Sequence, residues 1–289
     1  MYVVSKVVLG VVPPATFVLI RYVVAVPVLL VMFRLTHHSR GFDRRDWGAL
    51  ALASFVGFGV SLVAQFAGTK LSTAAAGALI TSATPAFIVV FAWLLLHEAA
   101  SPKQWLGLAL ATIGVLVVTL AGDQSATDQA TNPLLGNLLL IVAAVTWALY
   151  SVQVKRLTRT YSALAVTLGV TAIGVPIVAP VSVLELQTQS IGVITLPVLL
   201  GILYVGIGST AIAFFLWNKS FELLDAASAS LFFFAQPLVG VLLSALFLNQ
   251  PLQLSFFAGG GLILIGALLG IRSPWREASG LKSIGVEKA

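Results

Sequence analysis

The chain has 289 residues, of which 59% are hydrophobic and only 9% are charged, whereas a soluble domain carries about 25% charged residues. So few charges cannot cover the surface of a water-soluble fold, and we predict an all-α integral membrane protein. The chain contains no cysteine, which excludes disulfide bonds, thiol catalysis and thiolate metal sites.

Apolar runs of about 20 residues, the length that crosses a bilayer, follow one another along the chain. The gaps between them are mostly a few residues long, so we expect no extramembrane domain. Residues 1–12 are apolar but too few to cross, and two longer polar gaps lie at 122–133 and 185–195. The predicted full spans are residues 15–33, 47–66, 74–96, 104–121, 134–154, 161–184, 197–217, 226–248 and 252–271.

Lys and Arg collect in alternate gaps, which predicts the orientation because cytoplasmic loops are the basic ones. One side carries Lys70 alone, and the other carries thirteen cations: Arg34, Arg40, Arg44, Arg45, Lys103, Lys155, Arg156, Arg159, Lys219, Arg272, Arg276, Lys282 and Lys288. We predict that the basic side is cytoplasmic, in the plasma (bacterial inner) membrane, with the C-terminus. The formal charge of +6 then reflects topology and indicates no nucleic-acid partner. Predicted interfacial anchors at that boundary are Trp47, Trp105, Trp217 and Trp275.

Two apolar stretches with a central proline repeat along the chain. Leu79–Glu98 aligns without gaps with Leu231–Gln250, so that Pro85 matches Pro237, 152 positions later. The same offset aligns two pairs of glycines in the next run, Gly107 with Gly259 and Gly114 with Gly266. The chain is therefore predicted to be a duplicated unit.

The start of the chain fits this duplication. Tyr2–Lys6 resembles Tyr150–Lys155, the end of the fifth full span, so we expect the chain to begin within its first helix. This gives ten transmembrane helices in two five-helix repeats, residues 1–121 and 134–272, with an outer linker at 122–133 and a cytoplasmic tail at 273–289. Because five is odd, the second repeat is inverted in the membrane, an arrangement typical of transporters.

The order and spacing of several short motifs resemble the EamA-type ten-helix exporters of the drug/metabolite transporter superfamily. The motifs are Pro13-Pro14 with Phe17 and Leu19–Tyr22, Ala74–Ala76, Glu98, Gly107 with Gly114, Ala226–Leu231, Gln236-Pro237, and Gly259 with Gly266. Gln250 departs from the pattern, because many members have a second Glu there. The resemblance implies export of amino acids, related metabolites or amphipathic drugs. Among amino acids we expect aromatic or other apolar ones. A nucleotide sugar or a phosphorylated metabolite is the alternative substrate.

Charged residues inside the predicted spans are rare. All ten Asp and Glu lie in gaps, in the tail or at span edges. This argues against a carboxylate proton relay and favours a facilitator or weak coupling through another group. Lys6 and Arg21 both lie about 10 Å below the same outer turn, at 1.5 Å per helical residue. They either snorkel towards headgroups or line a hydrated cavity that offers positive charge to a substrate carboxylate.

Trp147, Tyr150 and Gln153 follow one another at helical i, i+3 spacing, and Trp147 lies near the middle of its span. One interpretation is a stacking and hydrogen-bonding wall for an aromatic or apolar ligand. The alternative is simple packing against lipid or neighbouring helices.

The two proline-centred stretches predict a central site in which Pro85 and Pro237 act as kinks or gates. Further candidates around the two prolines and in the preceding spans are Thr81, Ser82, Phe233, Gln236, Gln65, Phe58, Ser209 and Thr210. One half is rich in hydroxyls and the other in aromatic rings, so the predicted site is amphipathic. Any single hydroxyl could instead bond to its own helix.

Two other classes of protein fit the sequence less well. His37, His38 and His97 lie in gaps or at span ends and no H-E-x-x-H or G-x-S-x-G motif occurs, so we expect no enzyme, no catalytic residue, no metal and no cofactor. A scaffold needs no inverted duplication. The expected partners are a small-molecule substrate and membrane lipid. Small residues at Gly107/Ala111 and Gly266/Gly270 predict close helix packing or a dimer face, which leaves monomer and homodimer open.

Overall fold

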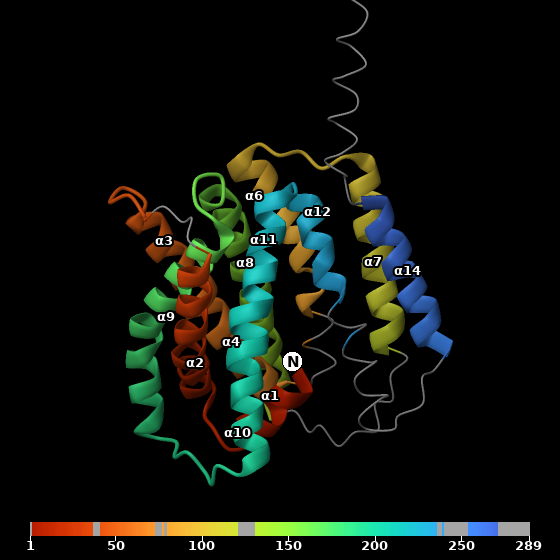
Figure 1. Cartoon of the computed structure of the whole chain (residues 1–289). Coiled ribbons are helices and arrows are strands. Elements are labelled where there is room, and N and C mark those ends of the chain that lie inside the picture. Colours follow the sequence, from red (N-terminus) through yellow and green to blue (C-terminus); the bar gives the residue numbers. More distant parts are fainter. Residues whose placement is uncertain are drawn as a thin grey trace, which may run out of the picture.

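The computed structural model describes residues 2–36, 41–72, 77, 80–120, 131–235, 239 and 254–270. Every regular element in these ranges is a helix (Figure 1), which confirms the predicted fold class. Within these ranges, five helices are long and apolar enough to cross a membrane: Pro14–Leu35, Trp47–Leu71, Pro133–Leu157, Ala163–Leu186 and Leu196–Leu223. The count of ten helices and the inverted repeats stay predictions.

Most of the described helices coincide with predicted spans. In the first half they are α1 (Tyr2–Leu9), α2 (Pro14–Leu35), α3 (Trp47–Ala53), the π-helix η1 (Ser54–Ser61), α4 (Leu62–Leu71), α6 (Thr84–Leu96) and α7 (Pro102–Leu120). In the second half they are α8 (Pro133–Leu157), α9 (Ala163–Leu186), α10 (Leu196–Leu203), the π-helix η2 (Tyr204–Ile212), α11 (Ala213–Leu223), α12 (Ala226–Ser230), the 3-10 helix η3 (Leu231–Phe234) and α14 (Leu254–Gly270).

Local sequence sets several helix ends. Asn132, Ser162 and Asp225 each accept a hydrogen bond from a backbone N–H in the first turn of the helix that follows. The first turn of α2 is instead capped from another helix. Glu185, at the end of α9, accepts from the backbone N–H groups of Ala15 (3.1 Å) and Thr16 (2.8 Å). This carboxylate therefore joins the two predicted repeats at one end of the bundle.

The helices pack as a bundle with one pair at its side. α2 lies against α9, and α4 and α6 lie against α8, while α7 and α14 form a pair at the edge (Figure 1). A Cβ atom at Gly114 would lie 2.5 Å from the carbonyl oxygen of Gly259, and one at Gly107 would clash with the carbonyl of Gly266. The prediction of close helix packing at these small residues is confirmed within the chain.

The helix around Pro85 differs from the prediction. The sequence predicts a continuous span with a central kink, but α6 begins at Thr84 and Pro85 occupies its first turn, after a turn at Ser82 and Ala83. Proline has no N–H and disfavours helical geometry in the preceding residue, so it starts a helix more easily than it continues one. In the second half the 3-10 helix η3 immediately precedes the proline-containing segment. Pro237 and Gln236 lie outside the described residues.

Candidate functional site

An aromatic cluster lies where η1, α8 and α11 meet. We define it as Phe58, Trp147, Tyr150, Phe214 and Trp217. Trp147 is central, with ring centroids 4.8 Å from Tyr150, 5.1 Å from Phe214 and 6.4 Å from Trp217. Phe58 lies 5.5 Å from Tyr150 and 5.4 Å from Phe214. These separations are typical of interacting rings, and both predicted repeats contribute.

Within the cluster, Trp147 and Tyr150 have different environments. Trp147 is half-buried, whereas Tyr150 is fully buried. The Tyr150 hydroxyl lies 3.1 Å from Oδ1 and 3.0 Å from Nδ2 of Asn218, and that Nδ2 donates to Thr167 Oγ1 at 2.9 Å. This network joins α8, α9 and α11. Trp147 therefore remains the candidate for ligand stacking, and Tyr150 holds the helices that present it.

Arg21 is buried beside the aromatic cluster, with an exposed fraction of 0%, so the snorkelling interpretation is wrong for this residue. Its Nε donates to Thr210 Oγ1 at 2.7 Å. The guanidinium carbon lies 5.3 Å from the ring centre of Phe66 and 5.2 Å from that of Phe214, distances typical of cation–π contacts. Within the described part of the chain, no atom accepts a hydrogen bond from Nη1 or Nη2, and both are buried.

The two π-helices position partners of α2. In η2, Thr210 donates to the carbonyl of Val205, five residues earlier, at 2.7 Å, and it accepts from Arg21 as above. In η1, the Phe58 carbonyl accepts from the Tyr22 hydroxyl at 2.7 Å. π-Helical turns are rare and frequent at functional sites, and here one occurs in each predicted repeat.

The other predicted site residues are spread over several environments. Thr81 donates to the carbonyl of Gly77 at 2.7 Å, which is the self-bonding alternative, and Ser82 is buried at the turn before α6. Phe233 reaches the cluster, since its ring centroid is 5.8 Å from that of Trp217. Gln153 has a buried Oε1 without a donor among the described residues.

The three remaining candidates are Ser209, Gln65 and Lys6. Ser209 is buried next to Thr210 on η2, and Gln65 is half-buried next to Phe66. The side chain of Lys6 lies outside the described set, so its role stays a prediction.

Sequence reasoning missed Phe214 and Asn218 and assigned Trp217 to the interface. Trp217 packs on Trp147 and donates from Nε1 to Ser151 Oγ at 3.2 Å, whereas Trp47 is 50% exposed and Trp105 47%. Trp275 lies outside the described residues. Phe214, Trp217, Asn218 and Phe221 share i, i+3, i+4, i+7 spacing, which places them on one helix face. This spacing can be read from the sequence and could have identified these residues as one packed face.

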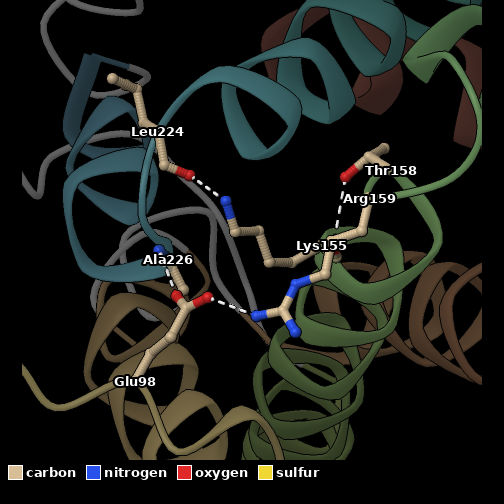
Figure 2. Close-up of polar contacts among 6 residues, drawn as sticks. All are labelled: Glu98, Lys155, Thr158, Arg159, Leu224 and Ala226. Carbon is tan, nitrogen blue, oxygen red and sulfur yellow. Dashed lines mark hydrogen bonds and ion pairs between the residues drawn. The ribbon is translucent and has the colours of Figure 1, made fainter. Parts of the chain in front are cut away.

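A polar cluster joins α6, α8 and α12 at the end of the bundle opposite Glu185, and Figure 2 shows its contacts. Glu98 pairs with Arg159 Nη2 at 2.9 Å and accepts from the backbone N–H of Ala226 at 3.1 Å. Lys155 Nζ donates to the carbonyl of Leu224 at 2.5 Å. A cavity of about 210 Å³ adjoins this polar cluster and is lined by Glu98, Asp225 and apolar residues. The sequence places Glu98 only at the edge of a predicted span and does not indicate these contacts.

Comparison with known proteins supplies the family. The sequence matches the EamA-like transporter family over residues 1–120 and 134–272. It is 28% identical over 250 residues to YetK, an uncharacterized transporter of Bacillus subtilis, which covers 86% of this chain and 75% of YetK. It is 25% identical over 261 residues to an uncharacterized transporter of Archaeoglobus fulgidus, covering 90% and 89% of the two chains.

The fold is also known from a crystal structure. That protein superposes with a TM-score of 0.74 at 20% sequence identity, over 92% of this chain and 89% of its own. The likeness in structure supports the helical architecture, and the sequence match covers both halves of the chain. The chain belongs to the EamA-like transporter family.

Proposed function

We propose that this transporter exports small metabolites, foremost amino acids with aromatic or other apolar side chains. The observation that carries the proposal is the half-buried Trp147 within a cluster of rings near the middle of α8, far from either end of that helix. Such a surface stacks an apolar or aromatic side chain. The buried Arg21 next to Phe214 adds one positive charge to the same region.

Transport proceeds by alternating access between the repeats 1–121 and 134–272, in the plasma (bacterial inner) membrane with a cytoplasmic C-terminus. Matching irregularities support this mechanism: η1 and η2 occupy equivalent spans, and the turn before Pro85 has its counterpart in η3. Inverted repeats exchange roles around a central site. During the transport cycle, the Glu98 contacts break when one end of the bundle opens, and the Glu185 contacts break when the other end opens.

The test is efflux from proteoliposomes loaded with single amino acids, using the wild type, Trp147→Ala and the exposed control Trp105→Ala. Removing a ring contact worth about 0.5–1.5 kcal/mol reduces affinity roughly 2- to 12-fold. We expect aromatic amino acids to leave faster than polar ones, and Trp147→Ala alone to lose this preference. Equal efflux of all amino acids from wild type and variant, or no efflux of any, refutes the proposal.

A further inference from the structure

The guanidinium of Arg21 has hydrogen-bonding capacity that the described residues leave unused. Phe66 and Phe214 lie against it at 5.3 and 5.2 Å, and Nε is bonded to Thr210. The unpaired atoms are the two terminal nitrogens, Nη1 and Nη2, which form a planar fork. We propose that this fork binds one carboxylate of the transported solute, end-on and bidentate, and that the solute needs no amino group. This inference rests on the proposed transport of a small organic solute.

The burial of Arg21 makes the pairing favourable. An arginine keeps its proton in proteins, so the charge remains inside, and a buried charge without a hydrogen-bonded counter-ion is costly. The two rings interact with the cation but accept no in-plane hydrogen bond. A carboxylate supplies two parallel acceptors in the plane of the fork.

The charge balance selects a monoanion. Among the described residues, Arg21 is the one charged side chain in the fully buried set. One carboxylate neutralises it, whereas a phosphate monoester adds a second negative charge that would stay unpaired in an apolar region. A phosphorylated substrate therefore fits this region less well than a carboxylic acid.

The positions of the acidic residues indicate whether an amino group of the solute is recognised. All ten Asp and Glu of the sequence lie in gaps, in the tail or at the edges of the predicted spans, so an ammonium has no carboxylate partner in the central region. Aromatic rings tolerate an ammonium through cation–π contacts. The structure thus assigns recognition to the carboxylate and to the apolar body, which reaches Trp147 across the single ring of Phe214.

Binding to purified protein in nanodiscs tests the inference, measured by calorimetry with 3-phenylpropionate, its neutral amide and phenyl phosphate. We expect the acid to bind at least about tenfold more tightly than the amide or the phosphate, since a bidentate charged pair is stronger than a neutral hydrogen bond. Arg21→Lys keeps the charge without the fork and should lose most of the preference for the acid, and Arg21→Met should lose all of it. Equal binding of acid and amide by the wild type, or tighter binding of phenyl phosphate, overturns the proposal.

Two further measurements distinguish failure of the carboxylate site from failure of the proposed transport. They are ligand binding by Thr210 variants, and export of the acid and the amide. Thr210→Val removes the acceptor of Nε and should weaken the acid selectively, with Thr210→Ser restoring it; a loss that is equal for acid and amide contradicts the assignment. If the acid binds preferentially but no solute crosses the membrane, the transport proposal fails and the carboxylate site stands. If acid and amide are exported equally, the site fails and transport stands. Should Arg21→Met not fold, the wild-type ligand comparison decides alone.

Discussion

The hydrogen bond between Tyr150 and Asn218 offers a quantitative test of the packing between α8 and α11. Interhelical hydrogen bonds in membrane proteins average about 0.6 kcal/mol, with a maximum near 1.7 kcal/mol. This one is fully buried. Without the Tyr150 hydroxyl, Asn218 Oδ1 loses its donor, while Nδ2 still donates to Thr167. We expect Tyr150→Phe to cost about 1–1.7 kcal/mol of unfolding free energy.

A double-mutant cycle isolates this interaction. Asn218→Ala should cost about 2–3 kcal/mol, because a cavity adds to the lost bonds. Thr167 keeps a partner in either case, since its hydroxyl donates to the carbonyl of Ala163 at 2.6 Å. In the Asn218→Ala background, Tyr150→Phe should therefore cost close to nothing.

Reversible unfolding in mixed micelles measures all four proteins of the cycle. The control is Tyr204→Phe, at a ring that is 47% exposed, and it should leave stability unchanged. If Tyr150→Phe costs the same with and without Asn218, the two side chains are not coupled and the described network is incorrect.

Two further predictions concern helix contacts. Gly107→Ala places a methyl group against the carbonyl of Gly266 and should destabilise the protein by about 1–3 kcal/mol, whereas Gly261→Ala, with nothing within 4 Å, should gain up to about 1 kcal/mol of helix propensity; equal shifts in thermal unfolding would contradict the α7–α14 packing. Oxidative cross-linking of a Glu98→Cys/Ala226→Cys pair, in a chain without native cysteine, should stop transport reversibly, while either single variant should remain active. Full transport by completely cross-linked protein would show that this end need not open.

The helical membrane fold could be predicted because span length and charge segregation are properties of the sequence itself. The position of Trp217 shows the limit. It lies near the end of a predicted span, as an anchor should, but its ring faces Trp147 of another helix. The spacing of Phe214, Trp217, Asn218 and Phe221 marks one helix face, but which helix that face packs against depends on the tertiary structure.

Arg21 and Glu98 illustrate the same limit for charged residues. The depth of Arg21 in the membrane could be estimated from the sequence, which places this cation inside a predicted span. Its burial depends on Phe66 and Phe214, which come from two distant helices. Likewise, the partners of Glu98 come from segments more than 60 positions away, so the sequence alone indicated only a loop.

The widened turns of η1 and η2 also determine where these long helices tolerate a change in length. A π-helical turn holds more residues than an α-helical turn, because its hydrogen bonds span five positions instead of four. Deleting one residue from the regular part of Trp47–Leu71 rotates everything beyond it by about 100° and moves Phe66 away from Arg21. Deleting one residue within Ser54–Ser61 lets that turn close as an ordinary α-helix, so the residues beyond keep their facing. Trp47–Leu71 and Leu196–Leu223 thus each contain one extra residue at the level of an aromatic or hydroxyl contact.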